Sequence, residues 1–210
     1  MLTLFLSGIA LGFTVAAPLG PVNLAVIRRG LASGFRPAWL LGLGAAIADA
    51  LYVILVFIGL APIFEHSFAF RLAMWGVGGA FLIYLGVSGM RAPQALSVSI
   101  EPSARAELHP FVAGFGITLL NPMTVVSWAA IGGAFFAMFA VDASLVNGVA
   151  LAVSVFVGSV LWSGAVALTI HFARRLVNDR GLRVVSVAAS LALIAFGVGF
   201  LVQAAQTILV

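Results

Sequence analysis

The feature that most constrains this chain is a series of continuous apolar stretches, each long enough to cross a lipid bilayer. A bilayer core of about 30 Å needs roughly 20 apolar residues in a helix that rises about 1.5 Å per residue. Six such stretches occur, at about 2–27, 38–61, 71–90, 111–140, 144–170 and 184–209. Barrel strands would instead alternate apolar and polar residues. The sequence therefore predicts an all-α integral membrane protein with six transmembrane helices in a single domain, 1–210.

The arginines indicate the orientation of these helices. All ten basic residues are arginines, and they lie mostly in the short stretches between apolar runs. If successive connections alternate between the two sides, nine arginines fall on one side and only Arg71 on the other. Arginine-rich connections stay in the cytoplasm. In a bacterial inner membrane we therefore expect both termini on the outer side and the connection 91–110 on the cytoplasmic side. Topology thus accounts for the net charge of +4 without a nucleic-acid partner.

The two halves of the chain share a short pattern. Gly12-Phe13 is followed by Pro18 and Pro21, and Gly114-Phe115 is followed by Pro122. Halves of about 1–90 and 111–210, joined by the connection 91–110, would hold three helices each, so the second half would be inverted in the membrane. Inverted repeats with broken helices at matching positions are typical of secondary transporters.

The first candidate site is the segment 17–23, Ala-Pro-Leu-Gly-Pro-Val-Asn. Pro18 and Pro21 remove backbone donors, and Gly20 relaxes the backbone between them, so we expect the helix to break here. Freed peptide groups inside a membrane need partners in the bundle or at a water-filled cavity, where they can coordinate an ion or a zwitterion. The alternative is a structural kink or the cytoplasmic end of the helix, with Asn23 as its cap.

The second candidate is Asn121-Pro122, which repeats the same arrangement of a helix-breaking proline beside an amide. The alternative interpretation is an ordinary hydrogen bond between helices, which in membranes contributes only about 0.6 kcal/mol.

The third candidate is Asp49, close to the centre of its apolar stretch. A carboxylate there costs roughly 2.5 to 3.5 kcal/mol or more on insertion scales, so we expect it to face the interior of the bundle. Burial favours the neutral form of a carboxyl group, and Asp49 could therefore bind and release a proton as access alternates. The alternative is a buried carboxylate held by backbone amides or by Asn23.

Several functions are disfavoured by what the sequence lacks. There is no cysteine, no phosphate-binding loop sequence for ATP, no Gly-x-Ser-Gly turn for a serine protease, and no metal-ligand cluster. We therefore expect no enzyme activity, no cofactor and no metal site. The aromatic and hydroxyl residues of the apolar stretches are interpreted mainly as packing or interface residues; they are Tyr52, Tyr84, Ser127, Trp128, Ser154, Ser159, Trp162 and Ser163.

The motif at 17–23, the following Arg28-Arg29-Gly30-Leu31, Asp49, and Leu119-Leu120-Asn121-Pro122 together resemble the lysine exporter family of amino-acid translocators. The resemblance covers essentially the whole chain, and the Pro-x-Gly-Pro-x-Asn form is closer to the basic-amino-acid exporters than to the homoserine and threonine exporters. It implies export of amino acids or similar metabolites driven by the proton motive force.

We therefore expect a secondary exporter, a proton antiporter for amino acids, that works in the lipid bilayer and is compatible with assembly as a homo-oligomer. Pro18, Gly20, Pro21 and Asn23 would form one wall of its cavity, Asn121 and Pro122 the facing wall, and Asp49 would carry the proton or attract the substrate ammonium. The alternatives are a cation or metal exporter of similar build and a non-catalytic membrane scaffold.

Overall fold

The computed structural model describes residues 2–18, 20–58, 67–91, 108–139, 145–176 and 179–209, and these residues form eight helices and no strands. Most of the predicted connection 91–110 and the predicted turn at 141–143 lie outside the described residues. The helices are α1 (Leu2–Ala16), α2 (Pro21–Ser33), α3 (Phe35–Phe57), α5 (Phe68–Arg91), α6 (Pro110–Leu119), α7 (Pro122–Phe139), α8 (Leu145–Leu176) and α9 (Asp179–Leu209).

Two of the six predicted membrane segments are broken, and the other four are continuous helices. Helices α3, α5, α8 and α9 are long and apolar enough to cross a membrane. Helices α1 and α2 meet at an angle of 76°, and α6 and the first part of α7 meet at 62°. The predicted break at the first proline pair is confirmed, as is the one at Asn121-Pro122. Six membrane segments result if each bent pair counts as one.

Helix extends into two of the predicted connections between membrane segments. Residues 28–37 were expected to form a connection, but α2 runs to Ser33 and α3 begins at Phe35, so only Gly34 separates them. Its φ of 86° is a conformation that glycine adopts without steric cost. Residues 171–183 were expected to connect two membrane segments, and helix extends into this connection from both sides, because α8 continues to Leu176 and α9 begins at Asp179. Arginine is a good helix former, so these charges do not end the helices.

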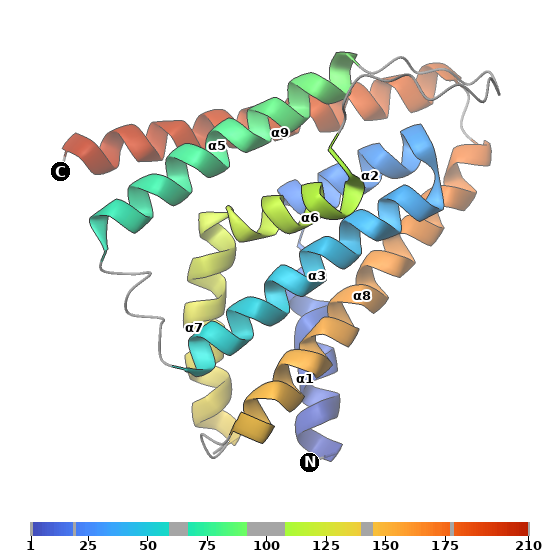
Figure 1. The fold of residues 1–210 in the computed structure, drawn as a ribbon. Helices are drawn as coiled ribbons and strands as arrows, with labels where there is room; N and C mark the ends of the chain where they lie inside the picture. Colours follow the sequence, from blue (N-terminus) through green and yellow to red (C-terminus); the bar gives the residue numbers. More distant parts are fainter. Residues whose placement is uncertain are drawn as a thin grey trace.

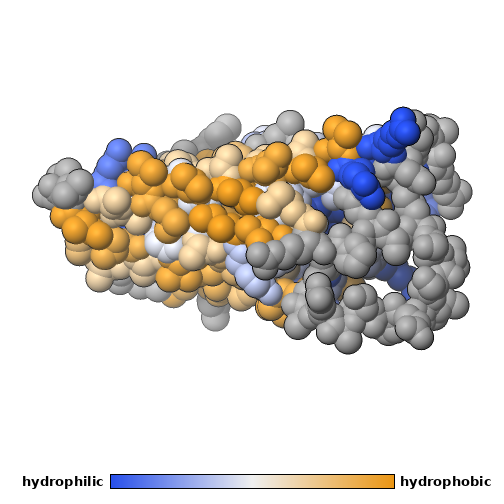
Figure 2. Space-filling model, turned by 90° about the horizontal axis from the view of Figure 1, so that it is seen from above, coloured by the Kyte–Doolittle hydropathy of each residue, from blue (hydrophilic) through white to orange (hydrophobic). Residues whose placement is uncertain are grey.

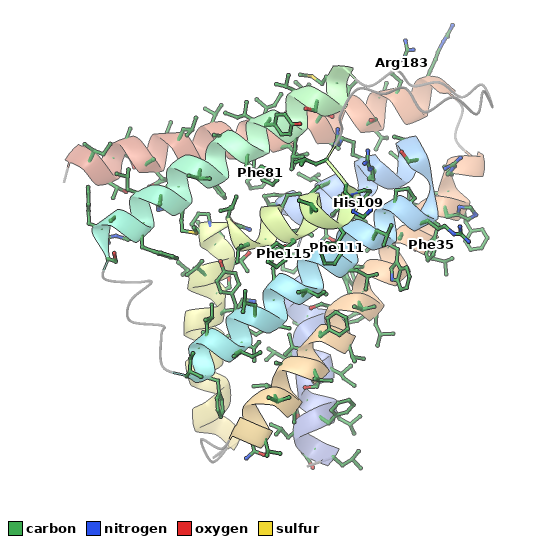
Figure 3. The ribbon with its side chains drawn as sticks, viewed as in Figure 1. Phe35, Phe81, His109, Phe111, Phe115 and Arg183 are labelled. Carbon is green, nitrogen blue, oxygen red and sulfur yellow. The ribbon has the colours of Figure 1, made fainter. Side chains whose placement is uncertain are left out.

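The helices pack as two groups (Figure 1). Helices α5 and α9 lie side by side, and α2 contacts α9 beneath them. Helices α3 and α8 pack together through the middle of the molecule, with α1 against α8 and α6 against α3. The ring of Phe81 on α5 lies in the space between α5 and α6, where it meets Gly116 (Figure 3).

Glycines allow the closest of these contacts. A methyl group added at Gly12 of α1 would overlap the carbonyl oxygen of Val155 on α8, and one at Gly114 of α6 would overlap the carbonyl oxygen of Leu41 on α3. Small residues let membrane helices approach until their backbones touch. The broken helices are thus held against α8 and α3 at fixed positions.

The outer surface carries the apolar side chains that a lipid environment requires. Seen from above, hydrophobic residues cover the middle of the molecule and hydrophilic ones gather towards its ends (Figure 2). Exposed leucine, valine, isoleucine and phenylalanine side chains occur on every described helix except α2. We conclude that the chain is a multi-pass membrane protein.

Substituting Gly114 by alanine should destabilise the bundle, because the new methyl group would overlap the Leu41 carbonyl oxygen. Overpacking of this kind costs about 1–3 kcal/mol. The matched control is Gly76→Ala on α5, where an added methyl group meets no atom within 4 Å. Thermal unfolding of both variants in detergent should show a lowered midpoint for Gly114→Ala alone; equal midpoints would contradict the proposed close packing of α6 on α3.

Candidate functional site

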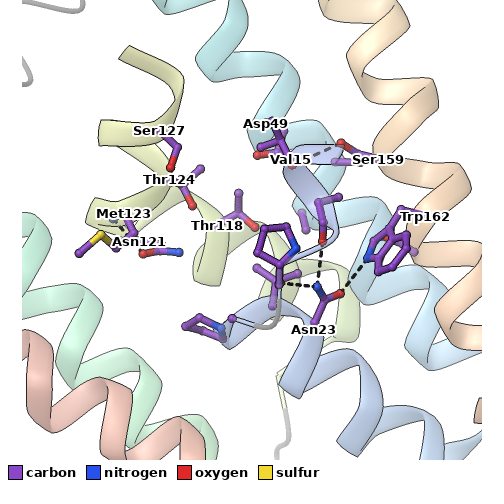
Figure 4. A pocket seen from close by; sticks show the side chains of 18 of the residues that line it. Val15, Asn23, Asp49, Thr118, Asn121, Met123, Thr124, Ser127, Ser159 and Trp162 are labelled. Carbon is purple, nitrogen blue, oxygen red and sulfur yellow. Dashed lines mark hydrogen bonds between the residues drawn. The ribbon is translucent and has the colours of Figure 1, made fainter. Parts of the chain in front are cut away.

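A cavity of about 280 Å³ lies between the two helix breaks. Its walls come from α1, α2, α3, α6, α7, α8 and α9. Figure 4 shows Asp49 of α3, Asn23 of α2 and Asn121, which directly precedes α7, around the same space. Several segments distant in the sequence therefore contribute polar groups to one enclosed volume.

At the first break, the side chain of Asn23 holds the end of α1 against the start of α2. Its Nδ2 donates to the carbonyl oxygens of Ala16 at 2.8 Å and Pro18 at 2.7 Å. Its Oδ1 accepts a hydrogen bond from the indole Nε1 of Trp162 at 3.2 Å, and the ring of Trp162 packs edge-on against Phe13. Asn23 is 5% exposed, so it satisfies carbonyl groups that have little access to water.

At the second break, two different side chains perform the equivalent task. The hydroxyl of Tyr52 on α3 donates to the carbonyl oxygen of Leu119, at the end of α6, over 2.5 Å. The Oδ1 of Asn121 accepts from the backbone N–H of Met123 at 3.0 Å, which caps the N-terminus of α7. The start of α2 has no such cap, because its N-cap residue is Gly20.

Asp49 is the acidic group of the cavity. Its Oδ1 accepts a hydrogen bond from Trp128 Nε1 at 2.9 Å, and its Oδ2 lies 3.5 Å from the hydroxyl of Ser159. The same hydroxyl lies 3.3 Å from the carbonyl oxygen of Gly12 on α1. A carboxylate has about four acceptor positions, so these two donors leave room for a proton or a further cation.

The remaining polar lining is neutral. Among the described residues that line the cavity, Asp49 is the only acid and none is basic. The hydroxyl of Thr118, which is 2% exposed, has no hydrogen-bond partner in the structure. Among the described residues, no group of three or more His, Cys, Asp or Glu side chains could hold a metal ion. The cavity can thus hold a small polar solute against one carboxyl group.

The structure brings together most of the residues proposed from the sequence. Pro18, Gly20, Pro21, Asn23, Asp49 and Asn121 all line the cavity, whereas Pro122 begins α7 and is not among the lining residues. Six further residues line it: Thr118 and Thr124, which the sequence analysis did not propose, and Ser127, Ser159, Trp162 and Ser163, which it interpreted mainly as packing residues. Their spacing could have indicated a shared lining, because positions 159, 162 and 163 lie on one face of α8 and positions 124 and 127 lie on one face of α7.

A bundle of membrane-spanning helices in which two broken helices flank a cavity that contains polar groups is typical of membrane transport proteins. The family model described as LysE type translocator matches residues 13–204, and the chain belongs to that family. This confirms the resemblance seen in the sequence motifs.

Individual relatives cover nearly the full length. The chain is 32% identical, over 99% of its length and 100% of the relative's, to the amino acid efflux protein YcgF of Bacillus subtilis (strain 168). It is 31% identical, over 83% of its length and 86% of the relative's, to the chemotactic transduction protein ChpE of Pseudomonas aeruginosa. It is 28% identical, over 89% of its length and 88% of the relative's, to the arginine exporter protein ArgO of Klebsiella pneumoniae. No solved structure matches.

The hydrogen bond between Asn23 and Trp162 should be measurable by a double-mutant cycle of Asn23→Ala and Trp162→Phe. Asn23→Ala alone should lower the free energy of unfolding by about 1–3 kcal/mol, because it leaves buried carbonyl groups unpaired. The coupling between the two substitutions should be about 0.6 kcal/mol and at most about 1.7 kcal/mol.

The measurement is reversible unfolding in mixed micelles. The control is Thr207→Ala, an exposed side chain that bonds only to the carbonyl of Gln203 in its own helix. Strictly additive effects of the Asn23 and Trp162 substitutions would contradict the bond.

Proposed function

We propose that this protein exports amino acids across the bacterial inner membrane in exchange for protons. The observation that carries the proposal is Asp49, a single carboxyl group in a cavity enclosed by two broken helices. Two relatives with most of their length matched are named for amino acid efflux and for arginine export. Their names support amino acids as the substrates.

One carboxyl group suffices for exchange if it binds either a proton or the substrate ammonium, and never both. A charged Asp49 attracts the ammonium group, and protonation removes that attraction. Protons that enter from outside would then displace the amino acid from the cavity, and a new substrate molecule from the cytoplasm would displace the proton. The indole of Trp128 remains a donor in both states.

Ser159 offers a route from this protonation to the helix break. A hydroxyl group donates only one hydrogen bond, and both Asp49 and the Gly12 carbonyl lie within reach of the Ser159 hydroxyl. A charged Asp49 draws that hydrogen bond to itself. A protonated Asp49 can donate to Ser159, which frees the hydroxyl to bond to Gly12 and so to α1.

Alternating access would arise from two inverted halves, α1 to α5 and α6 to α9. Two sets of helix contacts support such a repeat. Gly158 on α8 approaches the backbone of Ile9 and Phe13, and Gly44 on α3 approaches the backbone of Phe111 and Phe115. Phe111 and Phe115 of α6 lie 102 positions after Ile9 and Phe13 of α1, and Gly158 lies 114 positions after Gly44. The two contacts therefore join corresponding positions of the two halves.

A third contact supports the same symmetry. A methyl group added at Gly79 of α5 would lie 2.8 Å from the carbonyl oxygen of Gly197 on α9, and one added at Gly197 would lie 2.7 Å from that of Gly79. A reciprocal contact between equivalent positions is expected where a two-fold axis passes between two helices.

The arginine distribution supports an orientation with both termini outside.

Asp49→Asn should abolish export driven by a pH gradient, because an amide cannot exchange a proton near neutral pH. Purified wild-type and variant protein would be reconstituted into liposomes loaded with labelled amino acids, and efflux recorded with and without an imposed gradient. Glu101→Gln, the same chemical change in the connection between α5 and α6, should export as the wild type does. Gradient-stimulated efflux by a folded Asp49→Asn variant would rule out this role.

Ser159→Ala should weaken coupling rather than substrate binding. We expect exchange of substrate for substrate to persist while stimulation by the pH gradient falls several-fold. Ser154→Ala is the matched control, because Ser154 is equally buried on α8 but bonds to Leu151 within its own helix. An equal loss in both variants would indicate a merely structural effect of removing a hydroxyl from α8.

A further inference from the structure

The chemistry of the cavity also bears on which amino acids fit. We infer that the substrates are neutral amino acids with apolar side chains, bound with the carboxylate at the N-terminus of α2, the ammonium at Asp49 and the side chain towards Phe196 and Phe200. This inference rests on the proposed function and makes it more specific.

The carboxylate position follows from a difference between the two helix breaks. Asn121 caps the start of α7, but Gly20 leaves the start of α2 without a side-chain cap, and Asn23 is occupied with the end of α1. Pro21 has no N–H, so the amides of Val22 and Asn23 are the donors that the first turn of α2 offers. A helix N-terminus favours an anion.

A second observation points to a ligand in the same cavity. Thr118 lines it, is 2% exposed, and its hydroxyl has no partner. Figure 4 shows the Thr118 side chain among the residues around the cavity, which Pro18 and Pro21 also line. A buried hydroxyl without a partner is destabilising, and a bound carboxylate or ammonium group would supply the missing hydrogen bond.

The side chain of the substrate would lie at the apolar wall. Phe196 and Phe200 of α9 and Met123 of α7 line the cavity, and the same three residues line an adjoining apolar groove with Trp75. Gln203 is the only polar residue among the described residues of that groove. The groove therefore extends the apolar wall of the cavity outward.

A basic amino acid lacks a partner for its side-chain charge in this arrangement. Asp49 is the only acid among the described lining residues, and the α-ammonium uses it. A guanidinium or ammonium group against Phe196 and Phe200 would lose its hydration without a counter-charge, which is strongly unfavourable. The cavity volume of about 280 Å³ lies just below the roughly 300–1,000 Å³ typical of small-molecule sites, a size that suits one amino acid.

The test compares efflux of labelled leucine, methionine, lysine and arginine, one at a time, from proteoliposomes with an imposed pH gradient. The wild type should export leucine and methionine at least about tenfold faster than lysine and arginine. Leucinamide, which lacks the carboxylate, should not compete with leucine. Arginine efflux as fast as leucine efflux would overturn the inference while leaving amino acid export in place. No efflux of any of the four from folded protein would instead overturn the proposed function.

Phe196→Glu tests the apolar wall directly, since Phe196 is 39% exposed and its replacement leaves the buried core intact. The added carboxylate should raise arginine efflux relative to leucine at least about tenfold. Phe196→Gln introduces a neutral side chain of the same size as glutamate, and it should slow leucine efflux without speeding arginine efflux. If Phe196→Glu does not reconstitute, Met123→Glu places the charge on the α7 side of the groove. Unchanged preference in a reconstituted glutamate variant would contradict the assigned orientation.

Discussion

The structure depends on satisfying the peptide groups that are released where two membrane helices break. In lipid these groups have no water to bond, so each must find a partner within the protein. Asn23 supplies it for the end of α1, Tyr52 for the end of α6 and Asn121 for the start of α7. Of the four helix ends at the two breaks, only the start of α2 has no side-chain cap. Three of the four helix ends thus have a side-chain partner, and the fourth is the end at which we propose that the substrate carboxylate binds.

The same requirement explains why polar groups line part of the cavity. Broken helices can exist at membrane depth only where their ends face protein or a hydrated space. Close glycine contacts hold α1 against α8 and α6 against α3, which keeps both breaks beside Asp49. Asp49 is the only acid among the described lining residues, and in the proposed exchange its protonation state determines whether the cavity holds substrate.

Much of this was predictable because it depends on local rules. The prolines at 18, 21 and 122 predict breaks wherever they occur in a helix, and burial of Asp49 follows from the cost of a charge in lipid. The ends of α2 and α8 were harder, because arginine favours helix as well as marking a membrane boundary. The partners of Asp49 were not predictable, since Trp128 and Ser159 lie far along the chain and their residue types are common in membrane helices.

The sequence by itself determined the class of fold, the two break points and the acid between them, because length, hydropathy and proline act over one or two helical turns. Only the tertiary structure decided which carbonyls Asn23 and Tyr52 hold, which helix end remains uncapped and which wall of the cavity is apolar. Those outcomes depend on how α3, α8 and α9 pack around the breaks, and packing is a property of all the helices together.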